Sequence, residues 1–265
     1  MRHLVLLACL TACDLYVGSG DTPPDPPTDP DPPDPAAATF RLVLDDSMAG
    51  ERTINGIDSD GAGGLWILYR DPTAGYDDLA TLHVVHLDAQ RAKLSEWVLE
   101  DEYAWTSGIA YTGDAVWINY SGVDQKFLRK LDPITGATLG TFAMTGAITD
   151  ISAGGSDELL LSVAHNQVIA IDRTTGGQTT QTAVAAPFTS STQRGIVRVA
   201  GRSWVASWTT DDIYVVDDAG TITDIGTTDV RPGHVAAENI YLAWDGTRLV
   251  MSARNQIYWL AIDPL

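Results

Sequence analysis

Cysteine, positive charge and long apolar runs are scarce in this chain of 265 residues. Both cysteines, Cys9 and Cys13, lie within the first thirteen residues, so the rest of the chain can form neither a disulfide nor a thiolate metal site. Lysine and arginine number 16 against 35 acidic residues, and the formal net charge is −19. Because such a field repels phosphate backbones, we expect no nucleic acid partner.

Motifs for nucleophilic, metal and phosphate chemistry are missing or weak. The chain has no G-x-S-x-G elbow, and its glycine-rich stretch 61–64 precedes a strand pattern and not a helix. Asp58 and Asp60 resemble the start of a calcium loop, but Ala62 and Gly64 stand where further oxygen ligands would be needed. We therefore predict a turn there, and no metal or other cofactor.

His83 and His86 are the closest pair of histidines in the chain. They are three residues apart in a strand pattern, and this spacing places them on opposite faces of the strand. We expect one histidine to point inward and the other outward, without a shared metal.

The first twelve residues have the layout of an export signal. Arg2 supplies a positive start and residues 4–10 form an apolar run, which is much shorter than the roughly 20 residues that span a bilayer. The following Leu10-Thr11-Ala12-Cys13 resembles the bacterial lipobox. This resemblance implies cleavage before Cys13, diacylglycerol on its sulfur and a third acyl chain on the new amine. The alternative is an ordinary amino-terminal strand with a chance match.

Acylation at Cys13 predicts a lipid-anchored protein of the bacterial cell envelope. Two or three acyl chains hold a protein almost permanently on a bilayer, whereas one chain binds only marginally. The bilayer is then a partner through Cys13. The membrane is either the outer membrane or the inner membrane, with the protein on its periplasmic side.

Residues 13–38 are predicted to form a disordered tether after this anchor. Residues 14–38 hold eight of the thirteen prolines and six aspartates, with no lysine or arginine. Such a segment cannot bury apolar surface, and its prolines favour extended polyproline II. The alternative is that this proline-rich segment is a ligand for an aromatic-lined groove of another protein.

The remaining residues, 39–265, repeat with a period of 40–46 residues. An apolar residue followed by aspartate and a turn recurs at Asp88, Asp132, Asp172, Asp217 and Asp263. A second marker opens an earlier strand of each repeat, at Ile57, Ile109, Ile151, Ile196 and Ile240. The strands are short and alternate in polarity, and no helical periodicity is present.

A repeat of this length with four short strands is typical of a propeller blade. The stretches Asp58-Ser59-Asp60-Gly61…Trp66 and Leu131-Asp132…Thr135-Gly136 resemble the D-x-x-G-x-x-W and L-D-x-x-T-G signatures of NHL-like, YncE-like and regulator-type bacterial propellers. The resemblance covers residues 54–265 and implies an all-β, five-bladed β-propeller. A sixth, degenerate blade inside the long first repeat is the alternative.

The ends of the chain predict how the ring closes. The last repeat stops after three strands, whereas residues 40–44 form an extra strand before the first repeat. We expect residues 40–44 to pair antiparallel with residues 257–262 and with no other part of the chain, which leaves no incomplete blade. This pairing would bury Phe40, Leu42 and Leu44, or else the alternate face.

Ligands of propellers generally meet the face formed by the loops between blades and between second and third strands. On that face the sequence places polar and aromatic candidates: Arg70, Tyr103, Trp105, Tyr120, His165, Arg194, Trp208, His234 and Arg254. A few charged groups among aromatic surfaces suit a glycan or a protein. The alternative is that the tryptophans pack between blades and the arginines pair with the surplus carboxylates.

These features predict a non-catalytic, monomeric binding or scaffold module for an envelope protein or glycan. An envelope hydrolase or lyase with its site on the propeller axis is the alternative, and a purely structural spacer is a third possibility. Two carboxylates, or a histidine and a carboxylate, converging on the axis would favour the enzyme, since such pairs perform acid–base chemistry. A shallow face lined with aromatic side chains would favour the binding module.

Overall fold

The computed structural model describes residues 38–71, 79–103, 106–121, 126–155, 157–163, 166–184, 193–207, 212–228, 230, 240–253 and 255–264. They belong to the second of the two units of the chain, Pro35–Leu265. The predicted signal, Cys13 and nearly all of the tether lie outside the described residues. Every secondary-structure element of the described part is a β-strand. None of its segments is a helix long and apolar enough to cross a membrane.

The strands form five antiparallel groups of four, which we call repeats 1 to 5. Repeat 1 contains β2 (Thr53–Ser59), β3 (Leu65–Arg70), β4 (Leu79–Leu87) and β5 (Lys93–Tyr103). Repeat 2 contains β6 (Ser107–Tyr111), β7 (Val116–Ser121), β8 (Lys126–Leu131) and β9 (Thr138–Ala143). Repeat 3 contains β10 (Ile148–Ala153), β11 (Glu158–Val163), β12 (Gln167–Asp172) and β13 (Gln178–Ala183).

The other two repeats share one eight-stranded sheet. Repeat 4 contains β14 (Gln193–Val199), β15 (Arg202–Ser207), β16 (Asp212–Val216) and β17 (Ile222–Thr228). Repeat 5 contains β18 (Ile240–Trp244), β19 (Leu249–Ala253) and β20 (Gln256–Pro264), and β1 (Phe40–Ala49) supplies its outermost strand.

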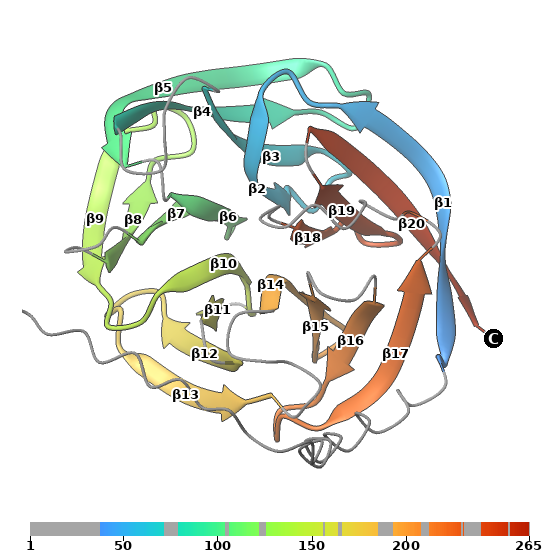
Figure 1. Cartoon of the computed structure of the whole chain (residues 1–265). Helices are drawn as coiled ribbons and strands as arrows, with labels where there is room; N and C mark the ends of the chain where they lie inside the picture. The colour runs from blue at the N-terminus through green and yellow to red at the C-terminus, as the bar shows by residue number, and fades with distance from the viewer. Residues whose placement is uncertain are drawn as a thin grey trace, which may run out of the picture. The chain divides into compact units, whose positions relative to one another are not determined.

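The innermost strands of the five repeats form a closed circle. Contacts join β2 to β6, β6 to β10, β10 to β14, β14 to β18, and β18 back to β2 (Figure 1). The outermost strands β5, β9, β13, β17 and β1 run around the rim (Figure 1). The described body is therefore an all-β, propeller-like fold, as the repeat pattern predicts.

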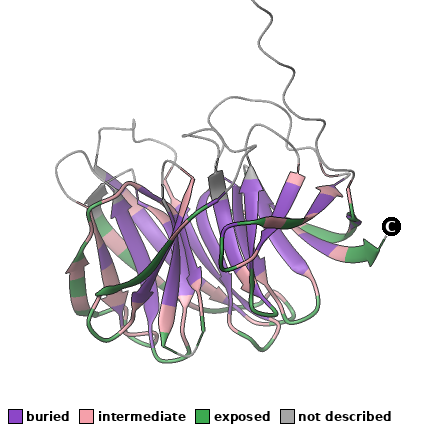
Figure 2. Cartoon of the chain, turned by 90° about the horizontal axis from the view of Figure 1, so that it is seen from below, coloured by how far each residue is buried: buried purple, intermediate pink, exposed green. Residues whose placement is uncertain are grey.

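Apolar side chains on both faces of the strands hold neighbouring repeats together. In β3, Leu65 and Ile67 pack toward repeat 5, whereas Trp66 and Leu68 pack toward repeat 2. The same alternation produces five buried clusters, one at each junction between repeats. Buried residues fill the centres of the strands and exposed residues gather at the turns and the rim (Figure 2). Strands covered on both sides explain the nearly continuous apolar runs.

The recurrent aspartate and glycine of the sequence shape the turns before the outermost strands. Asp132 Oδ1 accepts hydrogen bonds from the backbone N–H groups of Ile134 and Thr135, at 2.9 and 2.7 Å. Gly136 follows with a φ of 71°, and a Cβ added there would lie 2.9 Å from the ring of Trp97 in repeat 1. Glycine therefore supplies both the left-handed conformation and the close approach to the preceding repeat.

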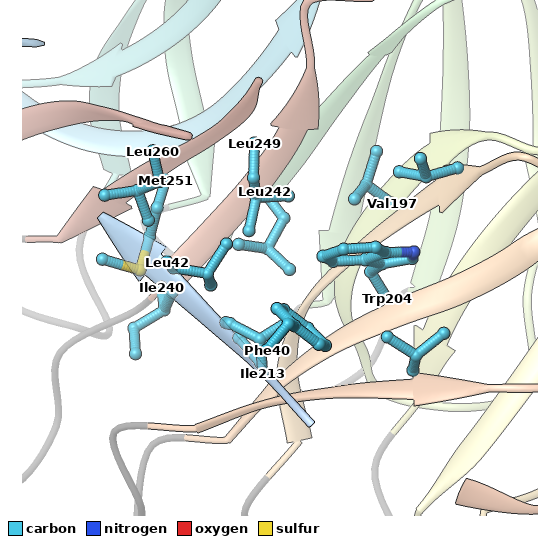
Figure 3. Packing of buried hydrophobic residues seen from close by; sticks show 13 residues of the cluster. Phe40, Leu42, Val197, Trp204, Ile213, Ile240, Leu242, Leu249, Met251 and Leu260 are labelled. Carbon is cyan, nitrogen blue, oxygen red and sulfur yellow. The ribbon is translucent and has the colours of Figure 1, made fainter. Parts of the chain in front are cut away.

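Closure of the ring by the amino-terminal strand is confirmed. β1 pairs antiparallel with β20, from Phe40 opposite Pro264 to Ala49 opposite Gln256, with a bulge between Leu44 and Asp46. Phe40 and Leu42 are buried in the cluster between repeats 4 and 5, where Phe40 lies 5.1 Å from the ring of Trp204 (Figure 3).

Two details of the expected closure are wrong. Residues 40–42 also pair in parallel with residues 226–228 of β17, so the start of β1 lies between two strands and joins repeat 4 to repeat 5. Leu44 is 47% exposed, although it is two residues after the buried Leu42 and therefore expected on the same face of the strand. The pairing with β17 ends at Leu42, so repeat 4 no longer covers the strand at Leu44.

The closing strand offers a matched pair of substitutions. Leu42→Ala should lower the free energy of unfolding by about 2–5 kcal/mol, the usual effect of removing a buried leucine side chain. Leu44→Ala should change it by less than about 0.5 kcal/mol, as for most surface positions. Urea unfolding of both variants measures the difference. Equal effects of the two substitutions would contradict this account of the closure.

Candidate functional site

Most of the predicted ligand face lies outside the described residues. This applies to Trp105, His165, Trp208, His234 and Arg254. Tyr103 is the last residue of β5 and Arg194 lies in β14, but their side chains are outside the described part. Arg70 ends β3 and is half-buried, opposite Leu82 of β4. The residues of this face stay predictions.

Tyr120 does not belong to an exposed face, contrary to the expectation from sequence. Its side chain is fully buried in the cluster between repeats 1 and 2. Its ring stacks on Phe127 at 4.4 Å, and the guanidinium of Arg129 lies 4.6 Å from its centroid. The alternation of β7 turns Tyr120 toward the neighbouring repeat, so it packs as a core residue.

The two histidines lie on opposite faces of β4, as predicted. His83 lies 2.9 Å from Glu96 on the side of repeat 5, and His86 lies 3.0 Å from Asp60 and stacks on Trp66 on the side of repeat 2. The expectation that one of them points outward is wrong, because both faces of repeat 1 are covered by neighbouring repeats. His83 is 8% exposed, and the side chain of His86 is 19% exposed.

The stretch that resembles a calcium loop forms a turn, as predicted. Asp60 Oδ1 accepts hydrogen bonds from the backbone N–H groups of Ala62 and Gly64, at 2.7 and 2.8 Å. Asp58 Oδ2 instead accepts one from the backbone of Tyr111 in repeat 2. The described part of the chain contains no group of three His, Cys, Asp or Glu side chains placed to hold a metal ion.

Asp150 lies where the innermost strands meet. Its carboxylate is fully buried and accepts hydrogen bonds of 2.9 Å from the backbone N–H groups of Ile151 in its own strand and Ile196 in β14. A Cβ added to Gly108 of β6 would lie 2.8 Å from Asp150 Oδ1. One side chain of repeat 3 therefore contacts the innermost strands of repeats 2 and 4.

Asp58 performs the same task between repeats 1 and 2. Its carboxylate, 6% exposed, accepts a hydrogen bond of 2.7 Å from the backbone N–H of Tyr111 and one of 2.9 Å from that of Ser59. We call Asp58 and Asp150 the axial carboxylates. Innermost strands have no sheet partner on the axis side, so their inward N–H groups need acceptors of this kind.

Burial is the largest influence on the pKa values of the axial carboxylates. No Lys, Arg or His among the described residues pairs with either group, so removal from water raises the pKa of Asp58 to about 7. Burial also raises the pKa of Asp150 well above its ordinary value, and the nearby charge of Asp58 raises it further. Hydrogen bonds from backbone N–H groups partly oppose this rise.

The axial carboxylates meet one expectation stated for an enzyme, since two acidic groups converge near the axis with raised pKa values. Their surroundings favour a structural role. Asp150 is fully enclosed and already accepts two backbone hydrogen bonds, so a substrate in solvent does not reach it. The arrangement joins strands to one another and offers no exposed acid or base.

Neither axial carboxylate was identified as such from the sequence. The sequence around Asp58 predicts only a turn, and no motif of the sequence marks Asp150. The available signal was their position next to the recurrent isoleucines, in Ile57-Asp58 and Asp150-Ile151. An aspartate inside an otherwise apolar strand is buried and needs hydrogen-bond donors.

The comparisons with known proteins identify a fold and no family. No family model matches the chain, and no curated protein matches it. Among solved structures, the crystal structure of Myxococcus xanthus glutaminyl cyclase resembles it with a TM-score of 0.64. The match covers 85% of this chain and 99% of the other, at 12% sequence identity. At that identity the likeness concerns the fold alone.

The axial carboxylates predict that stability falls as the pH rises. The folded protein retains protons that the unfolded chain releases above the ordinary aspartate pKa of 3.8, because the pKa of Asp58 is about 7 in the fold. The contribution of these two groups to the free energy of unfolding should therefore be largest below about pH 4. It should then decrease toward neutral pH by up to roughly 1.4 kcal/mol per pH unit for each group.

Urea unfolding of the wild type and of Asp58→Asn, measured between about pH 5 and pH 8, tests this dependence. Asp58→Asn should have a shallower pH slope, whatever its absolute stability, because the amide does not titrate. Asp157→Asn is the control, because Asp157 is an exposed aspartate between β10 and β11, and it should retain the slope of the wild type. A slope that Asp58→Asn leaves unchanged would rule out the proton held by Asp58.

Proposed function

We propose that this chain is a lipoprotein whose body is a five-bladed β-propeller, with each of repeats 1 to 5 as one blade. The circle of five innermost strands and the five clusters between repeats support five blades over six. The completion of repeat 5 by β1 supports a closed ring without an extra blade. The lipobox resemblance at Leu10–Cys13 supports acylation at Cys13 and attachment to the bacterial envelope.

We further propose that the propeller is a non-catalytic binding module for an envelope protein or glycan. The observation that carries this proposal is the state of the axial carboxylates. Both are buried in or beside the innermost strands, and their oxygens already accept hydrogen bonds from backbone N–H groups. The aromatic and charged residues of the ligand face, Trp105 and Trp208 above all, are then the groups best suited to hold a partner.

An envelope hydrolase or lyase is the second candidate function. The observation in its favour is that a solved structure with this fold is named as an enzyme, a glutaminyl cyclase. A fold of this kind hosts unrelated functions, so the likeness does not transfer that activity to this chain.

Anchoring is tested by Cys13→Ala. Without the thiol no diacylglycerol can be attached, so the protein should move to the soluble fraction or remain unprocessed. Membrane fractionation and the mass of the mature amino terminus measure both outcomes. Deletion of residues 20–36 should leave the protein in the membrane fraction and leave its thermal stability unchanged. A Cys13→Ala protein that stays membrane-bound with normal processing would refute the anchor.

The binding role is tested at the ligand face. Trp105→Ala and Trp208→Ala should each weaken retention of the protein on isolated envelope glycan or on its cross-linked envelope partner by roughly tenfold, since aromatic anchors carry much of a binding energy. Ile134→Ala, at a turn residue that is 83% exposed, is the control and should bind as the wild type does. Release of new products from the glycan during the same incubation would favour the enzyme.

A further inference from the structure

Large apolar side chains that are exposed to solvent gather on one part of the rim. Four of them belong to the neighbouring repeats 1 and 2, and we call these four the apolar rim: Leu94, Val98, Ile134 and Leu139. Their exposed fractions are 58%, 49%, 83% and 54%. Two more, Leu44 and Ile262, lie in repeat 5, whereas the described parts of repeats 3 and 4 contain none.

The turn before β9 brings repeats 1 and 2 into contact at this place. Gly136 follows Ile134 in that turn, and a Cβ added to Gly136 would lie 2.9 Å from the ring of Trp97. Trp97 belongs to β5, in which Leu94 and Val98 are four residues apart and share one face. The apolar residues of repeat 2 therefore lie beside the strand that carries those of repeat 1.

Repeat 3 has the same turn and strand but no apolar side chain at these positions. Its turn repeats the aspartate, threonine and glycine of repeat 2, so Thr174 and Thr179 correspond to Ile134 and Leu139. Both threonines are exposed. Exposure at these positions is therefore a property of the fold, whereas the apolar character is particular to repeat 2. The core does not require it, because neither apolar side chain is packed.

The same part of the rim lacks the negative charge that dominates the chain. No charged residue occurs between Asp132 and Asp150, although the formal net charge is −19. On β5 the one carboxylate between the apolar residues is that of Glu96. It accepts a hydrogen bond of 2.8 Å from Lys93 and lies 2.9 Å from His83. The apolar rim is thus a surface with which this acidic chain approaches an anionic surface at little electrostatic cost.

We propose that the apolar rim rests on the bilayer to which Cys13 is attached and inserts its side chains among the lipid headgroups. This inference rests on the proposed anchor, which joins the body to the membrane through residues 14–38. Exposed apolar side chains bind at the boundary between headgroups and acyl chains in proportion to the apolar area that they bury. The anchor makes this contact intramolecular, so a weak insertion is sufficient.

A bilayer fits the apolar rim better than a second copy of the chain does. A stable interface between proteins contains roughly 20–30 residues on each side. The apolar rim offers four exposed apolar side chains on a convex edge of the ring, and this is far less than such an interface needs. Insertion of an anchored protein has no comparable requirement for area.

Contact at this place also orients the propeller. Ile134 lies in the turn from β8 to β9. The other end of β8 adjoins the loop between the second and third strands of repeat 2, which belongs to the predicted ligand face. The ends of the strands that carry the ligand face are then turned away from the bilayer, where an envelope partner reaches them.

Nitroxide labels on single introduced cysteines test the proposal. Cys13 is the only cysteine after the predicted cleavage site, and its sulfur is acylated in the anchored protein. Ile134→Cys and Leu139→Cys are compared with the matched controls Thr174→Cys and Thr179→Cys. Each mature protein is reconstituted in vesicles of phosphatidylethanolamine and phosphatidylglycerol.

The measured quantity is the ratio of label collisions with oxygen, which is enriched in the bilayer, to collisions with water-soluble chromium oxalate. This ratio should be several-fold higher at the two positions of repeat 2 than at the two positions of repeat 3. The same comparison is made with proteins that carry Cys13→Ser and an amino-terminal hexahistidine tag in place of residues 1–12, held on vesicles by a nickel-chelating lipid. They should give the same ratios, because the tag replaces only the attachment.

A double substitution tests whether the apolar side chains cause the insertion. Ile134→Ser together with Leu139→Ser should lower the collision ratio of a label at Leu94→Cys to that of an exposed position, since the apolar area available for burial is lost. Thr174→Ser together with Thr179→Ser is the control and should leave the label at Leu94→Cys unchanged.

Equal collision ratios at the labels of repeats 2 and 3 overturn the proposal, as does a label at Leu94→Cys that ignores the serine substitutions. Protection of the repeat 2 labels from chromium oxalate without vesicles would show that a second copy covers the apolar rim, and it too would overturn the proposal. The tagged proteins keep these outcomes independent of acylation, which Cys13→Ala tests separately.

Discussion

The buried carboxylate of Asp150 is the contact on which the ring depends most. Each repeat ends at the axis with a strand that has no sheet partner on that side, so its inward N–H groups need an acceptor. Asp150 provides one for β10 and β14 at once and lies against Gly108 of β6. The carboxylate loses its hydration in return, and this loss appears as the raised pKa.

The rim is held by a different device, the amino-terminal strand. β1 bonds to β17 of repeat 4 and to β20 of repeat 5, and its Asp46 pairs with Arg91 of repeat 1. The bulge between Leu44 and Asp46 coincides with two consecutive aspartates that bind arginines of different repeats. The closing strand therefore joins three repeats, and it supplies the outermost strand that repeat 5 otherwise lacks.

The turn before the outermost strand can be compared between the repeats of this one chain. In three of them the turn before the outermost strand has a glycine that lies against the preceding repeat, and this explains the glycine of the L-D-x-x-T-G signature. Repeat 1 departs from the rule at Arg91, whose side chain pairs with Asp46 of the closing strand. The ion pair and the contact of Arg91 with the ring of Trp259 accompany this departure from glycine.

The sequence by itself determined the strands, the repeat, the aspartate turns and the pairing of residues 40–44 with the last repeat. These features follow from local alternation, turn chemistry and the count of strands, all of which a short window of residues carries. Only the tertiary structure decided that Tyr120 is core, that β1 also pairs with β17, and that Asp58 and Asp150 meet the strands of other repeats. It also brought Asp88, Arg91, Arg248 and Trp259 together from the two ends of the chain. The physical reason is that which strand lies against which, and how closely, depends on how five repeats close into one ring, and no single repeat contains that information.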